Sequence, residues 1–124
     1  MSLEENKAIV RKMVEATNKK DLAVFNEFID EYMAVDFVDR SSQGEVQGRE
    51  HVKQADAMVL KEYPDLRETI EDIIAEGDRV WVHAKITGTD SSGKKMDATA
   101  LYILRIVNVK FVEGWGPFFL QKTP

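Results

Sequence analysis

Carboxylates and phenols are the side chains of this sequence that could move a proton. Asp39 follows a short extended segment, and burial beside Phe37 would raise the pKa of its carboxyl towards a value that suits a general base. Asp97 is a second candidate base, while Tyr63 and Tyr102 carry hydroxyls that can donate to a developing oxyanion. The four residues are candidates for enol or aldol chemistry, which needs a base at the α-carbon and an oxyanion donor.

Simpler roles are open for each of these groups. Asp39 can pair with the adjacent Arg40 at the surface, and the tyrosines can be packing residues with a hydroxyl in water. Asp97 lies in a segment with apolar residues on both faces, so its orientation is open. A further alternative is an Asp–Arg–Asp water-activating trio of the epoxide-hydrolase type, for which the sequence supplies Asp39, Arg40, Asp97 and Arg105.

The composition argues against several other chemistries. The 124 residues include no cysteine, which excludes a thiolate nucleophile and a Cys-ligated metal site. The two histidines, His51 and His83, lack carboxylates at metal-ligand spacing, and no Gly-rich phosphate loop is present, so we expect no metal and no organic cofactor. A net charge of -5 argues against nucleic acid as a partner.

The chain is expected to be a cytoplasmic protein without a membrane partner. Its longest uninterrupted apolar run covers residues 100–104. A membrane-spanning helix needs roughly 20 apolar residues. The N-terminus is acidic and lacks the basic and apolar regions of a signal peptide.

Helical spacing of apolar residues dominates the first half of the chain. Ser2 and Glu5 form a capping-box pattern, Asp21 can cap a second helix, and Pro64 ends a third. The predicted helices cover residues 3–17, 22–32 and 49–63. Residues 34–47 are predicted as a short strand that leads into a loop.

Alternating residues dominate the second half. From Leu66 onward, turn signals divide the chain into four strands of an antiparallel meander. Helices followed by strands are typical of an α+β fold in which the helices cover one face of a curved sheet. Val80 and Val82 share the predicted core face, whereas Trp81 and His83 lie on the outer face. Trp81 there is either a lone exposed aromatic residue or part of a subunit contact.

Short motifs spread over the whole chain resemble the SnoaL-like polyketide cyclase family. They are Asn-Lys-Lys-Asp-Leu (18–22), Asp-Phe-Val-Asp (36–39), Gln-Gly-Arg-Glu (47–50), Tyr-Pro-Asp-Leu (63–66), Ala-Glu-Gly-Asp-Arg-Val (75–80), Gly-Thr (88–89) and Glu-Gly-Trp (113–115). The resemblance implies a nuclear-transport-factor-2-like (cystatin-like) fold, with three helices on a strongly bent antiparallel sheet that forms a cone. It also implies one domain over residues 1–124, a small apolar ligand in the cone and a homodimer, here through the outer sheet face.

The resemblance also implies a catalytic set from which this sequence departs. In the family, an aspartate four residues after the last-strand tryptophan acts as acid/base in a cofactor-free ring closure, and counting from Trp115 leads to Phe119. Histidines of the family's pattern are replaced by Arg40 and Asp90. Because phenylalanine cannot exchange a proton, the family's usual mechanism is not available to this chain.

The cone is expected to be lined by Phe37, Tyr63, Tyr102, Glu113, Trp115 and Phe119. The leading hypothesis is a cofactor-free cyclase, isomerase or hydrolase that uses Asp39, with Asp97 as the second candidate. One alternative is a ketosteroid-isomerase-like or epoxide-hydrolase-like enzyme. The other is a non-catalytic ligand-binding or dimerisation module in which Phe119 and its neighbours fill the cavity.

Overall fold

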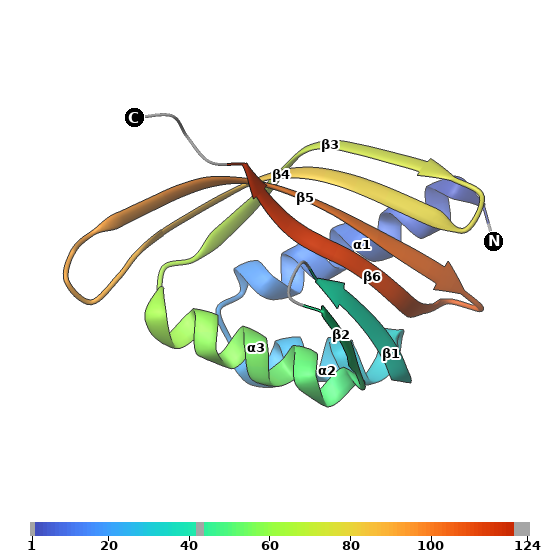
Figure 1. Cartoon of the computed structure of the whole chain (residues 1–124), viewed down its shortest axis with the longest axis horizontal. Helices are drawn as coiled ribbons and strands as arrows, with labels where there is room; N and C mark the ends of the chain where they lie inside the picture. The colour runs from blue at the N-terminus through green and yellow to red at the C-terminus, as the bar shows by residue number, and fades with distance from the viewer. Residues whose placement is uncertain (1, 42–43, 121–124) are drawn as a thin grey trace.

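Across residues 2–41 and 44–120, which the computed structural model describes, the chain forms three helices and six strands (Figure 1). The elements in chain order are α1 (Leu3–Asn18), α2 (Leu22–Tyr32), β1 (Met33–Ser41), β2 (Gly44–Gln47), α3 (Arg49–Glu62), β3 (Arg67–Glu76), β4 (Arg79–Thr89), β5 (Lys95–Val107) and β6 (Lys110–Leu120). The predicted α+β class is confirmed.

The helices begin at the predicted residues and end within one residue of the predicted ends. The Ser2 hydroxyl accepts a hydrogen bond from the Glu5 backbone N–H, and the Glu5 carboxylate accepts one from the Ser2 backbone N–H, both at 3.1 Å. Asp21 accepts two hydrogen bonds from the first turn of α2. These bonds satisfy donors that have no partner within a helix. Helix α3 ends at Glu62, two residues before Pro64, which disfavours helical geometry in Tyr63.

The sheet is mixed, with the strand order β2-β1-β6-β5-β4-β3. Strands β3 to β6 form the antiparallel meander that the sequence predicts. Strand β1 pairs with β6 in parallel, so the expectation of an antiparallel sheet throughout is wrong at this position. The segment predicted as a loop also contains β2, which pairs with β1 as a hairpin. Parallel pairing joins strands far apart in sequence, and no local turn signal announces it.

Register shifts bend the sheet towards the helices. They interrupt the pairing of β3 with β4 between Ile70 and Asp72, and the pairing of β5 with β6 between Leu101 and Ile103. An extra residue in one strand bends that strand and increases its local twist. Figure 1 shows the helices gathered on one side of the curved sheet, with α1 running along it.

The core lies between this side of the sheet and the helices. Val80 and Val82 of β4 are buried there, as predicted, against Val10 and Ile29 of the first two helices. Trp81 faces the opposite side, also as predicted. Helix α3, by contrast, contributes no fully buried residue. It therefore lies across the open end of the fold with space beneath it.

Candidate active site

An inner cavity lies between the helices and the inner face of the sheet. It consists of two adjoining pockets of about 210 Å³ and about 410 Å³. Both pockets are lined by Met13, Asp39, Val52, Glu68, Ile86 and Pro117. These six residues come from α1, β1, α3, β3, β4 and β6, so the cavity exists only once the whole fold has formed.

Most of the wall is apolar. Phe37 lines the smaller pocket, while Tyr63 and Phe119 line the larger one. Phe119 retains 56% of its surface exposed, so its ring lies at the mouth and leaves the cavity open. A wall of this kind suits a small apolar molecule, and the few polar groups within it would orient that molecule.

Asp39 is the first of these polar groups. It lies on the same side of β1 as Phe37, and its side chain is only 26% exposed. The pKa of its carboxyl is raised because burial disfavours the charged form, and the nearby His51 partly offsets this effect. The His51 Nε2 atom lies 3.9 Å from the Asp39 Oδ2 atom. Asp39 is thus a partly buried carboxyl of raised pKa on an apolar wall, as a general base requires.

The expected ion pair between Asp39 and Arg40 is not formed. Neighbouring residues of a strand point to opposite faces, and Arg40 points away from the cavity. Its guanidinium binds Glu113 at 2.5 Å and Glu45 at 2.6 Å. Among the described residues, Asp39 instead has its ion-pair contact with His51.

Glu68 is a second cavity carboxyl, and the sequence analysis missed it. The Tyr102 hydroxyl donates to its Oε2 atom at 2.5 Å. Burial raises the pKa of Glu68, and the hydrogen bond from Tyr102 partly offsets this effect. Burial also raises the pKa of Tyr102, and the adjacent Glu68 adds to that shift. Glu68 is in phase with the inward-facing Leu66 and Ile70, and this pattern could have revealed it.

Asp56 is a third carboxyl, on α3, and it too was missed. It lines the larger pocket, and burial raises the pKa of its side chain. It follows Val52 by four residues and precedes Val59 by three, so the helical spacing places it on the apolar face of α3. A carboxyl on the apolar face of a predicted helix was therefore the feature of the sequence that could have identified Asp56 as a cavity residue.

Tyr63 reaches the larger pocket from the end of α3. Burial raises the pKa of its phenol, as do the neighbouring Glu62 and Asp90. Gly88 allows its close approach, because a Cβ at that glycine would lie 3.0 Å from the Tyr63 Cβ atom. The cavity thus brings together Asp39, Tyr63 and Tyr102, three candidate site residues that lie in separate segments of the sequence.

Comparison with known proteins identifies the family of this chain. The sequence profile described as SnoaL-like polyketide cyclase matches residues 7–118. The chain belongs to the SnoaL-like polyketide cyclase family. No curated protein matches it significantly.

Solved structures of similar proteins share the SnoaL-like fold. AclR from Streptomyces galilaeus, a candidate hydroxylase, is 31% identical, with a TM-score of 0.80 over 92% of this chain and 74% of that one. A candidate SnoaL-like polyketide cyclase from Jannaschia sp. CCS1 is 21% identical, with a TM-score of 0.82 over 90% and 83%. IdmH from Streptomyces antibioticus, a candidate polyketide cyclase, is 23% identical, with a TM-score of 0.76 over 89% and 88%.

The polar groups of this SnoaL-like cavity differ from those that the resemblance implied. Phe119 is apolar, Arg40 is bound to carboxylates outside the cavity, and the Asp90 carboxylate accepts hydrogen bonds from Ser92 and Lys94 within its own turn. The carboxyls of the cavity are instead those of the first strand, α3 and β3. They are the carboxyls that the cavity offers for acid/base chemistry.

Asp97, whose orientation the sequence left open, lies outside the inner cavity. The preceding Met96 lines the larger pocket, so alternation along β5 sends Asp97 to the outer face. There its carboxylate lies 3.8 Å from the Lys85 ammonium. Arg105 is also on the outer face, bound to Asp78 at 2.8 Å, so the trio of the epoxide-hydrolase alternative is not assembled.

Glu113 and Trp115 also point outward. Gly114 between them faces the core, and Glu113 binds Arg40, so the expectation that Glu113 lines the cavity is not met. Trp115 borders the smaller pocket, but its ring lies 4.7 Å from the Arg79 guanidinium on the outer side. Because neighbouring residues of a strand point to opposite faces, the inward position of Gly114 places Glu113 and Trp115 on the outer face.

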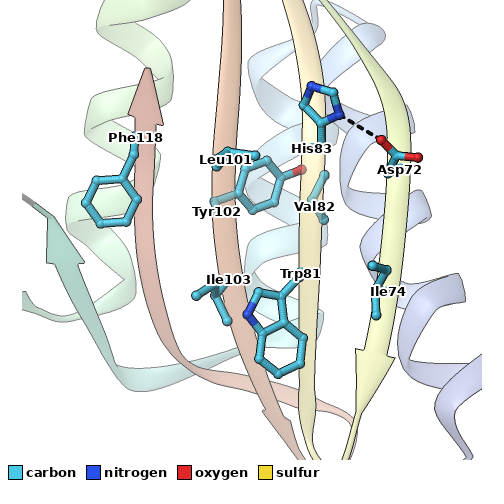
Figure 2. A pocket seen from close by; sticks show the side chains of 9 residues that line it. All are labelled: Asp72, Ile74, Trp81, Val82, His83, Leu101, Tyr102, Ile103 and Phe118. Carbon is cyan, nitrogen blue, oxygen red and sulfur yellow. Dashed lines mark hydrogen bonds and ion pairs between the residues drawn. The ribbon is translucent and has the colours of Figure 1, made fainter. Parts of the chain in front are cut away.

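An outer groove of about 560 Å³ lies on the opposite face of the sheet. Figure 2 shows its lining, with Ile74, Trp81, Leu101, Ile103 and Phe118 around an apolar floor. At one end, the Asp72 carboxylate lies 2.8 Å from the His83 Nδ1 atom, drawn as a dashed line in Figure 2.

Across residues 2–41 and 44–120, no three His, Asp or Glu side chains are grouped so that they could hold a metal ion. Within the same residues, no helix combines the length and the apolar character needed to cross a membrane.

Proposed function

We propose that this SnoaL-like protein is an enzyme that transfers a proton on a small, mostly apolar carbonyl compound in the inner cavity, with Asp39 as the base. The observation that carries the proposal is a partly buried carboxyl with a raised pKa on the wall of an open apolar cavity. A base of raised pKa is both ionised and strong enough near neutral pH to take a proton from carbon.

The reaction class follows from the groups available. Asp39 would remove a proton from the carbon next to a carbonyl group and leave an enolate. That enolate can be protonated at another carbon, which is an isomerisation, or can attack a second carbonyl of the same molecule, which is an aldol cyclisation. The apolar wall would exclude water and keep the electrostatic effects of the polar groups strong.

The alternative of a filled, non-catalytic module has less support. It requires Phe119 and its neighbours to occupy the cavity, whereas Phe119 is more than half exposed at the mouth. The cytoplasmic location expected from the sequence stays a prediction.

Hydrogen exchange at carbon tests the proposal without knowledge of the natural substrate. The protein would be incubated in D₂O with a panel of mono- and polycyclic ketones, and deuterium at the α-carbon would be followed by NMR and mass spectrometry. We expect exchange with the unmodified protein and a loss of about 10² to 10⁴-fold in Asp39→Asn, the usual contribution of a general base.

Asp97→Asn is the matched control, because it makes the same chemical change on the outer face. Exchange that survives in Asp39→Asn would remove Asp39 from the mechanism. Ketones that bind without any exchange would favour the ligand-binding module.

We also propose that the outer groove pairs with a second copy of this chain. A cross-strand row joins Ile74, Trp81, Ile103 and Trp115, and its exposed apolar groups would be covered in a dimer. Such a two-fold contact joins the same patch on both chains.

Charged side chains border this apolar row on both sides. Arg105 is paired with Asp78 on one side, and Lys85 is paired with Asp97 on the other, so the apolar row rather than the charges carries the proposed contact. Light scattering over a range of concentrations is the test. A dimer mass supports the pairing, and a monomer at all concentrations contradicts it.

A further inference from the structure

The hydrogen-bonded pair of Glu68 and Tyr102 has no part in the reaction as described so far. The Tyr102 hydroxyl and the Glu68 carboxylate are 2.5 Å apart, and both residues line the smaller pocket together with Asp39. Burying a carboxyl costs stability, and an apolar pair would fill the same space without that cost. The pair therefore calls for a functional explanation.

The backbone at Glu68 is held in place from α1. The Asn18 side-chain amide donates to the Glu68 carbonyl oxygen and accepts from the Glu68 backbone N–H, both at 2.8 Å. This two-point contact joins residues 50 positions apart. It fixes the part of β3 from which the Glu68 side chain enters the cavity, as expected where a side chain needs a set position.

The cavity contains few groups that can stabilise negative charge. Among the described residues, neither pocket is lined by a lysine or an arginine. The Thr17 hydroxyl already donates to the Met13 carbonyl oxygen. His51 lies beside Asp39, which is the base of the proposed reaction. The Tyr102 hydroxyl lines the smaller pocket and can donate to an oxyanion there once protonation of Glu68 frees its proton.

We propose that Glu68 and Tyr102 form an oxygen-binding subsite that receives the carbonyl oxygen of the ligand, with Tyr102 as the hydrogen-bond donor. The inference rests on the proton transfer proposed for Asp39, because it explains where the negative charge of that step goes. The natural ligand is then a ketone or a related carbonyl compound whose oxygen enters the smaller pocket.

The step balances without a further reactant. The C–H bond breaks and its proton moves to the Asp39 carboxylate, while the electron pair forms a carbon–carbon double bond. The carbonyl π pair moves to oxygen, which accepts the hydrogen bond from Tyr102. When Glu68 is protonated, its O–H donates to the Tyr102 oxygen, and the Tyr102 proton is free to turn towards the ligand.

The protonation of Glu68 gives the subsite a pH dependence. Its raised pKa means that the neutral form persists to higher pH than for an exposed glutamate, and ionisation draws the Tyr102 proton back to the carboxylate. The other titratable groups that line the cavity are Asp39, Asp56 and Tyr63, and His51 lies beside the first of these.

A matched pair of ligands tests the subsite independently of turnover. 1-Tetralone and tetralin share a skeleton, but only the first has a carbonyl oxygen. Dissociation constants would be measured by NMR titration, together with the ¹³C shift of the bound carbonyl. We expect the ketone to bind about tenfold more tightly than the hydrocarbon, which corresponds to one hydrogen bond in a dry site.

Tyr102→Phe should remove this preference and the downfield carbonyl shift, while tetralin binding is unchanged. Tyr32→Phe is the control, because Tyr32 contacts Lys12 on the outside of the helices and its hydroxyl does not line the cavity. Glu68→Gln is a second variant. Its amide can donate to the Tyr102 oxygen as the protonated carboxyl does, so the ketone preference should stay at its acidic-pH level and no longer depend on pH.

Equal binding of the two ligands, or a ketone preference that survives in Tyr102→Phe, would overturn the subsite. Binding of neither ligand would overturn it together with the proposed use of the cavity. A preference that depends on Tyr102, found without any α-carbon exchange, would support the subsite while it removes the role of Asp39.

Discussion

At the scale of single residues, burial rather than residue type decides which carboxyls can do chemistry. Asp39 and Glu68 have raised pKa values because the cavity wall excludes water from them. Asp65 has a lowered pKa, because hydrogen bonds from Thr89 stabilise its charged form. The same functional group is thus a candidate base in one place and a structural acceptor in another.

The His51 side chain should tune the base. Its positive charge lowers the pKa of Asp39, against the larger effect of burial. In His51→Gln the pKa of Asp39 should rise further, so the acidic limb of the pH–rate profile for α-carbon exchange should move to higher pH. Arg49→Gln on the same helix is the control for lost charge, since Arg49 contacts Asp30. An unmoved acidic limb would show that His51 does not act on the base.

Glu68 should make the protein less stable as the pH rises. Folding raises its pKa, so the folded chain holds this proton over a pH range in which the unfolded chain has released it. The free energy of unfolding therefore falls as the pH rises through that range. Asp39 and Asp56 act in the same direction.

Urea unfolding of Glu68→Gln at several pH values isolates this effect. The variant should match the unmodified protein at acidic pH and become increasingly more stable in comparison as the pH rises. Glu71→Gln, an exposed change on the same strand, is the control. A difference between Glu68→Gln and the unmodified protein that stays constant with pH would contradict the assigned burial of this carboxyl.

At the scale of elements, pairing irregularities decide which residues share a face. Trp115 pairs with Ile103 and Phe118 pairs with Leu101, so β6 has one residue more than β5 over this stretch. The extra residue inverts the alternation, and Phe119 thereby reaches the inner cavity. Counting along the strand could not reveal this inversion, because it depends on the partner strand.

Gly114 allows β6 to lie close to β1 and β5. A Cβ at this position would lie 2.9 Å from the Phe37 Cζ atom and 3.1 Å from the Leu104 Cδ2 atom. Gly114→Ala should therefore lower the free energy of unfolding by about 1 to 3 kcal/mol, the usual cost of overpacking a core. Thermal and urea unfolding would measure it.

A second variant tests whether contact with the Phe37 ring causes the loss of stability expected for Gly114→Ala. Phe37→Leu shortens the ring that an added Cβ would meet, so the double variant should lose less stability than the sum of the two single variants. Additive losses would show that the crowding lies elsewhere.

At the scale of the whole molecule, the sheet has two faces with separate roles. The inner face and the helices enclose the cavity, whereas the outer face presents the groove proposed to join two copies. Tyr102 faces the cavity between two outer-face neighbours, Leu101 and Ile103. Association would therefore stiffen β5, the strand that carries Tyr102.

Ile74 is the residue whose change should dissociate the proposed dimer. Its side chain is 62% exposed in the outer groove, so Ile74→Glu would leave a monomer intact but bury a charge in the contact. We expect dissociation to become at least about tenfold easier, as measured by sedimentation equilibrium. Met58→Glu is the control, because Met58 is 73% exposed on α3. Equal dissociation of both variants would argue against the outer groove as the contact.

The sequence by itself determined the helices, the meander and the family. Ser2, Asp21 and Pro64 act on the backbone within a few residues, and the alternation around Trp81 acts within one strand. Such signals can be read without knowledge of the partner segments. The same holds for Asp39, whose place after Phe37 on a strand was sufficient to predict a cavity position.

Only the tertiary structure decided which other groups meet in the cavity. Glu68 and Tyr102 are 34 residues apart and come together because β3 and β5 flank β4. Glu113 was expected inside and the orientation of Asp97 was open, and the register of their strands places both outside. The physical reason is that burial, and with it the pKa of a carboxyl, depends on neighbours that are distant in sequence.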